Sequence, residues 1–243
     1  MNFTALGIAV ICTAAFFIGF SKAGVPGLVI LLSPLVAMIM PVRESTGFLL
    51  PILVAGDIMS VLYWRRTASW KHLRRLLPWA CLGVILGSFL MGHISDEVFK
   101  PLLGGMIVLM VVFNAVLRLG KAEPRLGNKY LTAAIGVVAG VFTMMANAAS
   151  PIMAVYLLSM GMSKEDYVGT NAWFFMILNI FKLPFSAALG LTTWQFLKID
   201  IALIPLIAAG GAAGVFLVRR LPQKAFSMAV QILAAAAGLK LIF

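Results

Sequence analysis

The chain has 243 residues, of which 62% are hydrophobic and 11% are charged, and its formal net charge is +11. Soluble domains are about 45–50% apolar and about 25% charged, so this composition excludes a soluble globular protein. The basic residues form short clusters between apolar segments and not a stripe with interleaved aromatic residues, which argues against nucleic-acid binding.

Apolar segments recur along almost the whole chain and leave no room for a soluble domain. Because about 20 apolar residues form one membrane span, we predict an all-α polytopic membrane protein with a single transmembrane domain at 1–243. The segments are expected at 3–20, 26–41, 46–64, 73–92 and 99–118 in the first half, and at 129–145, 150–161, 167–188, 199–218 and 224–242 in the second. No basic residue precedes Lys22, so we expect no cleaved signal peptide.

The two halves of the chain match each other. The least apolar linker, Arg118 to Lys129, separates a repeat at 1–120 from a repeat at 128–243. Matches in a constant order are Gly47 with Gly169, Asp57 with Asn179, Trp70 with Trp194, Pro78 with Pro205, Gly83 with Gly210, Gly87 with Gly214, and Phe99 with Phe226. We infer an internal repeat, with five segments in each half.

The charges of the loops predict how the two repeats are oriented. The loop around Trp70 is the most basic in the chain, so the positive-inside rule places it in the cytoplasm. The equivalent loop around Trp194 is nearly uncharged and is expected outside, together with both termini. Equivalent loops on opposite sides require inverted repeats, which are a recurring plan of secondary transporters with a substrate site near the membrane midplane.

In each half, a stretch of small residues separates the first two segments. The two stretches read GFSKAGVPG at 19–27 and MANAASP at 145–151, and they predict broken or re-entrant hairpins whose tips meet in the bilayer. Pro26 and Pro151 suit the first turn of the outgoing helices, whose backbone N–H groups favour an anion. Alternatively, the small residues only pack helices together.

Three ionisable residues lie within these segments and breaks, where a charge is costly and therefore a functional candidate. Lys22 and Lys182 are candidates to bind an anion, with snorkelling to the interface as the alternative. Asp57 is interpreted as the only obvious intramembrane carboxylate, and it is either a proton or cation site used for coupling or the structural partner of a lysine. The candidate substrate-binding residues are Ser21, Lys22, Gly24, Asn147, Ser150, Thr170, Asn171 and Lys182.

Motifs of other protein classes are missing. The sequence contains no P-loop and no HExxH pattern, and its two histidines, His72 and His93, are expected in loops on opposite sides. We therefore expect no motor, no metal site and no cofactor.

Three motifs resemble the TauE/SafE family of sulfite exporters and sulfonate permeases. They are GFSKAGVPG at 19–27, ANAASP at 146–151 and VGTNAWFF at 168–175, and the resemblance covers essentially the whole chain. It implies a multi-pass permease of the bacterial inner membrane for sulfite, sulfonates or related carboxylates. In that family each half opens with a glycine-rich run, whereas here Lys22 stands in the first run and the second run has Asn147, Ala148, Ala149 and Ser150.

We therefore predict a transporter, not an enzyme, that carries a small anion by alternating access. Export is the expected direction, because each negative charge leaving a negative interior gains about 2.3 kcal/mol per 100 mV. Proton- or sodium-coupled import is the alternative, and an intramembrane enzyme or a membrane scaffold are the remaining rivals. The expected partners are the anion and the lipid bilayer, and a homo-oligomer is compatible with the sequence.

Overall fold

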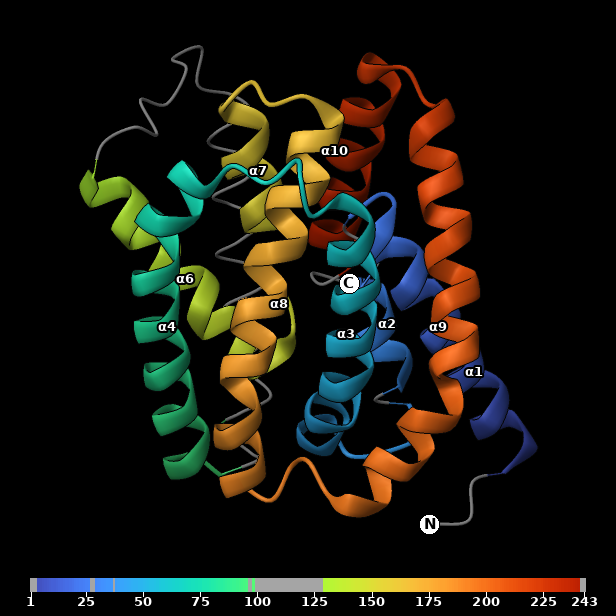
Figure 1. The fold of residues 1–243 in the computed structure, drawn as a ribbon. Coiled ribbons are helices and arrows are strands. Elements are labelled where there is room, and N and C mark those ends of the chain that lie inside the picture. Colours follow the sequence, from blue (N-terminus) through green and yellow to red (C-terminus); the bar gives the residue numbers. More distant parts are fainter. Residues whose placement is uncertain (1–3, 27–28, 37, 96–97, 99–128, 241–243) are drawn as a thin grey trace.

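The computed structural model describes residues 4–26, 29–36, 38–95, 98 and 129–240 (Figure 1). Within these ranges every regular element is an α-helix. The helices are α1 (Ala5–Ala23), α2 (Val29–Val36), α3 (Val42–Trp64), α4 (Trp70–His93), α6 (Lys129–Ala146), α7 (Ser150–Ser159), α8 (Lys164–Ala188), α9 (Trp194–Arg220) and α10 (Gln223–Lys240). The predicted segment at 99–118 lies outside the described residues. The prediction of an all-α membrane protein is confirmed, since α1, α3, α4, α6 and α9 are each long and apolar enough to cross a membrane.

The short helix α2 differs from its predicted segment at 26–41. It extends from Val29 to Val36 in the described residues. Pro26 precedes the described part of α2, and the two residues between them, 27–28, lie outside the described residues. In the second half Pro151 does lie in the first turn of α7, as predicted.

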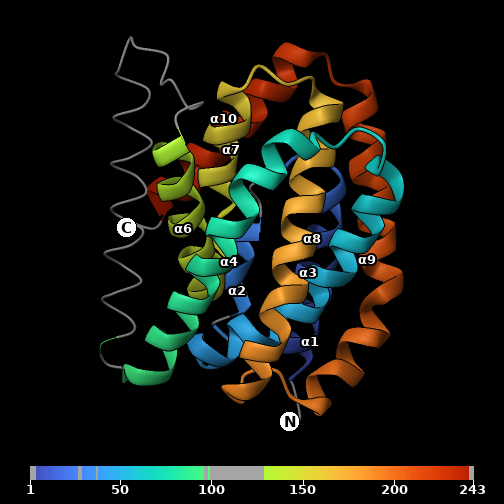
Figure 2. The same ribbon diagram turned by 60° about the vertical axis from the view of Figure 1, so that its left-hand side comes forward.

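Three helix pairs organise the described residues. The helices α3 and α8 lie side by side at the centre in both views (Figures 1 and 2). The pair α1 and α9 packs on one side of them, and the pair α4 and α6 packs on the other. Of the two central helices, α3 packs mainly on α1 and α9, and α8 packs mainly on α4.

Glycine residues bring the backbones of the outer pairs into direct contact. A Cβ atom added to Gly210 of α9 would overlap the carbonyl oxygen of Phe16 on α1, and a Cβ on Gly140 of α6 would overlap that of Ala80 on α4. Inside a bilayer the hydrophobic effect does not drive helices together, because the lipid tails are as apolar as the helices. Close contacts between small residues are therefore a main source of helix association. Each outer pair is consequently a closely packed unit.

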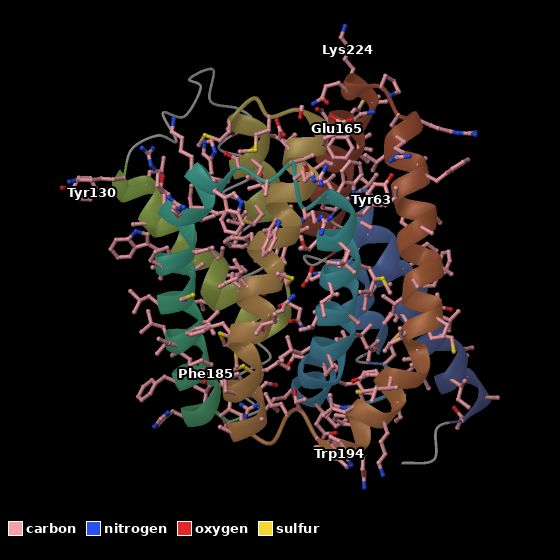
Figure 3. All side chains as sticks on the ribbon, viewed as in Figure 1. Tyr63, Tyr130, Glu165, Phe185, Trp194 and Lys224 are labelled. Atoms are coloured by element: carbon pink, nitrogen blue, oxygen red, sulfur yellow. The ribbon has the colours of Figure 1, made fainter. Side chains whose placement is uncertain are left out.

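The loops are sorted by charge between the two ends of the helix bundle. Tyr63, Tyr130 and Lys224 lie toward one end and Trp194 lies at the other (Figure 3). The end that holds Tyr63 also holds the basic residues that surround the α3–α4 and α9–α10 loops, namely Arg65, Arg66, Lys71, Arg74, Arg75, Arg219, Arg220 and Lys224. His72 and His93, expected in loops, lie instead in the first and last turns of α4.

This sorting predicts that the equivalent α3–α4 and α8–α9 loops face opposite sides of the membrane. Arg66 and Gln195 are both exposed, so each can be replaced by cysteine in a background in which Cys12 and Cys81 are serine. An impermeant thiol reagent applied to intact cells should label Gln195→Cys, and it should label Arg66→Cys only after the cells are opened. Ala139→Cys is a buried control that should stay unlabelled. Labelling of both loops from one side would contradict the predicted topology.

Candidate functional site

The C-terminal end of α1 is held by side chains of α3. The last carbonyl groups of a helix lack partners within the helix, and two of them are bonded here from outside. The hydroxyl of Ser60 donates to the carbonyl oxygen of Lys22 at 2.7 Å, and the indole Nε1 of Trp64 donates to that of Ala23 at 2.9 Å. These bonds fix the backbone of Lys22 within the membrane-spanning part of the chain.

The side chain of Lys22 is buried and paired. Its Nζ lies 2.7 Å from Oδ1 of Asp57 on α3 and 4.5 Å above the ring centroid of Phe175 on α8. Gly56 leaves room for the lysine stem, because a Cβ at this position would approach Cγ of Lys22 to 3.2 Å. Lys22 is 6% exposed and Asp57 is 0% exposed, so this is a buried ion pair and not a lysine that snorkels to the surface.

A second buried lysine joins the pair through an asparagine. Nδ2 of Asn179 donates to Oδ2 of Asp57 at 2.6 Å, and Oδ1 of the same amide accepts from Nζ of Lys182 at 3.3 Å. Lys182 also donates to Oδ1 of Asn147 at 2.6 Å and to Oγ1 of Thr143 at 3.3 Å. The ammonium of Lys182 is therefore surrounded by three neutral oxygen atoms. We call Lys22, Asp57, Asn179, Lys182, Asn147 and Thr143 the buried charge cluster.

Asn147 occupies an unusual position in the cluster. It follows the last residue of α6 and has a φ of 53°, in the left-handed region that asparagine tolerates better than most residues. Its Nδ2 donates to the carbonyl oxygen of Thr46 on α3 at 3.1 Å. The side-chain amide of Asn147 thus links the second break to α3 through Nδ2 and to Lys182 through Oδ1.

The predicted repeats place the residues around the two lysines at matching positions. The offset that matches Asp57 with Asn179 (179 − 57 = 122) also matches Ser60 with Lys182 (182 − 60 = 122). The offset that matches Pro26 with Pro151 (151 − 26 = 125) matches Lys22 with Asn147 (147 − 22 = 125). In the first half the cation lies at the break, and in the second half the cation lies on the central helix.

The charges of the cluster do not cancel. Lys22 and Asp57 neutralise each other, whereas no described carboxylate forms an ion pair with Lys182. Removing a charge from water costs several kcal/mol, and this cost is offset only by good pairing and by further hydrogen bonds. With Lys182 protonated, the cluster holds one positive charge that is balanced by neutral dipoles alone, which is an arrangement suited to an anion.

Several predicted site residues are outside the cluster. The hydroxyl of Ser21 donates to the carbonyl oxygen of Val25 at 3.3 Å within the first break. Gly24 lies against the backbone of Gly214 on α9, so its lack of a side chain serves helix packing. Ser150 is the buried first residue of α7.

The two predicted polar residues early in α8 lie nearer the end of the bundle. Oγ1 of Thr170 accepts from the backbone N–H of Ser69 at 2.8 Å, which joins α8 to the start of α4. Asn171 is 2% exposed, and its Oδ1 has no hydrogen-bond partner. It lies eight residues before Asn179, or about 12 Å along the helix axis.

The structure adds residues that the sequence analysis missed. Asn179, Thr143 and Phe175 complete the surroundings of the two lysines, and a second carboxyl group, Asp200 on α9, lies inside the membrane-spanning part. Asp200 is 5% exposed, and neither of its carboxyl oxygens has a hydrogen-bond partner. The interpretation of Asp57 as the only intramembrane carboxylate was therefore wrong. Asp200 falls within the predicted segment at 199–218, which was the signal available.

Among the described residues, no group of three or more His, Cys, Asp and Glu side chains could hold a metal ion. A family model described as Sulfite exporter TauE/SafE matches residues 11–241, nearly the whole chain. No curated protein and no solved structure gives a significant match.

The buried ion pair predicts a specific pattern in a double-mutant cycle. Asp57→Leu leaves Lys22 unpaired and should lower the free energy of unfolding by about 3–5 kcal/mol. Adding Lys22→Met should recover at least half of this loss, because a nonpolar pair needs no compensation. Thermal unfolding in detergent measures both, with Glu165→Gln at the exposed end of α8 as the control. Strictly additive losses would contradict a direct pair.

Proposed function

The chain belongs to the TauE/SafE sulfite exporter family, and we propose that it is a secondary transporter that carries a small oxyanion across the bacterial inner membrane. The observation that carries this proposal is the uncompensated positive charge at Lys182, buried beside the Lys22–Asp57 pair. A membrane protein has little reason to bury a second ammonium without a counter-ion unless a ligand supplies one.

The proposed ligand is sulfite, an organic sulfonate or a small carboxylate. Lys182 makes one short bond, to Asn147 at 2.6 Å, and two longer ones, to Thr143 and Asn179 at 3.3 Å. An oxyanion can take the place of either longer bond and accept a hydrogen bond from the ammonium, and a bond between two ionised groups is stronger than the bond to a neutral oxygen that it replaces. The hydroxyl of Thr143, released from Lys182, can then donate to the same anion.

Alternating access supplies the proposed mechanism, with the two halves as inverted repeats. Two features support it. By the sequence matches, α1 of the first half corresponds to α6 of the second, and α4 of the first half corresponds to α9 of the second. The contact of α1 with α9 is therefore equivalent to the contact of α6 with α4. The loops around Trp70 and Trp194 also lie at opposite ends of the bundle. In this arrangement the cluster lies at the boundary between the repeats, where such transporters bind substrate.

Export is the proposed direction. With a negative interior, each negative charge that leaves the cell gains about 2.3 kcal/mol per 100 mV, so efflux requires no coupling ion. Asp57 is committed to Lys22 and Asn179, and its proposed role is to hold the Lys22 ammonium in place.

Proton-coupled transport is a second candidate function, and Asp200 favours it. A carboxyl group this deeply buried without a partner is most stable with a proton or small cation bound. Asp200 lies on α9, which packs directly on α1, the helix that carries Lys22. A change in the charge of Asp200 can therefore act on the cluster through the closely packed α1–α9 pair.

Replacing Lys182 tests the proposed anion site. Lys182→Met removes the unpaired charge but leaves only neutral partners behind, so the protein should fold. Its affinity for the transported anion should fall at least tenfold, or about 1.4 kcal/mol. Binding and flux are measured with purified protein and proteoliposomes, using labelled sulfite, sulfonates and carboxylates, with Lys198→Met, an exposed lysine of α9, as the control. Unchanged binding by Lys182→Met would place the anion elsewhere.

Replacing Asp200 separates the two candidate functions. If transport is coupled to protons, a pH gradient should drive flux through the wild-type protein and through Asp57→Asn, but not through Asp200→Asn, which carries no titratable group at that position. Anion affinity should stay near that of the wild type in Asp200→Asn and should not fall in Asp57→Asn, because that variant removes a negative charge that faces the anion site. Flux of the wild-type protein that ignores the pH gradient would exclude coupling and leave uncoupled export.

A further inference from the structure

A second cationic site lies apart from the buried charge cluster, at the end of the bundle that holds Tyr130. A cavity of about 380 Å³ opens there between α4 and α6. Its walls are Arg74, Arg75, Pro78, Trp79, Lys129 and Thr132. Among the described residues that line the cavity, three are cations and none is an acid, which favours an anionic group.

The cavity is separate from the proposed transport site. Its wall on α6 includes Thr132, whereas the cluster residue on the same helix is Thr143, eleven residues further along (143 − 132 = 11). This spacing corresponds to about 16 Å along the helix axis. Between the two sites, Gly83 and Gly140 bring the backbones of α4 and α6 together, which closes the space between the helices below the cavity.

An apolar stripe on α4 begins at the cavity and runs toward the opposite end of the helix. Trp79, Leu82, Leu86 and Phe89 are 44%, 41%, 44% and 62% exposed, respectively, and their spacing of three and four residues places them on one face of the helix. From Trp79 to Phe89 the stripe covers ten residues, or about 15 Å. This is half of the roughly 30 Å hydrocarbon core, the depth of one leaflet.

We propose that this surface binds an anionic phospholipid, with the phosphate in the cavity and an acyl chain along the stripe of α4. Arginine and lysine side chains recognise phosphate through charge-assisted hydrogen bonds, and basic pockets between membrane helices suit anionic headgroups. Trp79 joins the two parts, since it lines the cavity and starts the stripe, and tryptophan prefers the membrane interface. The inference does not depend on the identity of the transported anion.

Native mass spectrometry of the purified full-length protein tests this proposal with three probes: phosphatidylglycerol, phosphatidylcholine and glycerol 3-phosphate. The protein should retain phosphatidylglycerol at least tenfold more tightly than phosphatidylcholine. It should bind glycerol 3-phosphate at least tenfold more weakly than phosphatidylglycerol, because this soluble phosphate has no acyl chain to place on the stripe. Equal binding of glycerol 3-phosphate and phosphatidylglycerol would show a site for soluble phosphates, and equal binding of the two lipids would overturn the proposal.

A matched pair of variants assigns the binding to the cavity. Arg74→Gln with Arg75→Gln and Lys129→Gln removes the three cations of the cavity and should weaken phosphatidylglycerol binding at least tenfold. Arg65→Gln with Arg66→Gln and Lys71→Gln removes three exposed cations from the same end of the bundle but outside the cavity, and it should change binding less than twofold. Equal losses in both variants would mean that general surface charge holds the lipid.

A second measurement applies if the triple variant does not fold. Phosphatidylglycerol brominated on its acyl chain quenches nearby tryptophan, so it should quench the wild-type protein more than Trp79→Phe does, in proportion to bound lipid. Brominated phosphatidylcholine at the same concentration should not reproduce this difference. Identical quenching of the wild-type protein and Trp79→Phe would overturn the proposal independently of the charge variants.

Discussion

The cost of burying charge in a membrane is the constraint on which the centre of this structure depends. An ammonium or carboxylate away from water is tolerated only where opposite charge or several fixed dipoles surround it. Lys22, Asp57 and Lys182 meet this condition only together with Asn179, Asn147 and Thr143. Because these residues come from α1, α3, α6, α8 and the break after α6, satisfying the charges also fixes how the two halves of the chain meet.

The sequence predicted those parts of the fold and site that depend on local properties. Apolar segments indicate helices wherever they occur, and an ionisable residue inside one is conspicuous, which is why Lys22, Asp57 and Lys182 could be selected without a structure. Asn179 and Thr143 could not be selected in the same way, because neutral polar residues are ordinary in membrane helices. Their importance comes from neighbours that lie far away in the sequence. Asp200 was missed because the predicted segment began at 199, which put this residue at the edge of the membrane. The helix in fact begins at Trp194, where Thr193 caps it by accepting from the backbone N–H of Phe196. Asp200 therefore lies six residues inside α9.

The breaks show a different limit of sequence analysis. Small residues are required both where a ligand approaches the backbone and where two helices touch, so composition alone does not separate the two uses. Gly24 was expected to line the anion site, but the backbone of Gly214 occupies the space that its missing side chain leaves. Asn147, at the corresponding break of the second half, does point a side chain at a buried lysine. Each break therefore supplies one side chain to the buried charge cluster, Lys22 in the first half and Asn147 in the second, whereas Gly24 serves helix packing.

The left-handed backbone at Asn147 restricts how this position can evolve. Glycine, asparagine and aspartate adopt this conformation most readily, and asparagine and aspartate codons differ by a single nucleotide. The most accessible substitution at this break therefore places a carboxylate 2.6 Å from the atom that Asn147 now contacts on Lys182. Such a cluster would contain two cations and two anions and would have no charge left for a ligand. If the cluster is the anion site that we propose, one point mutation would thus be enough to make it electrically neutral.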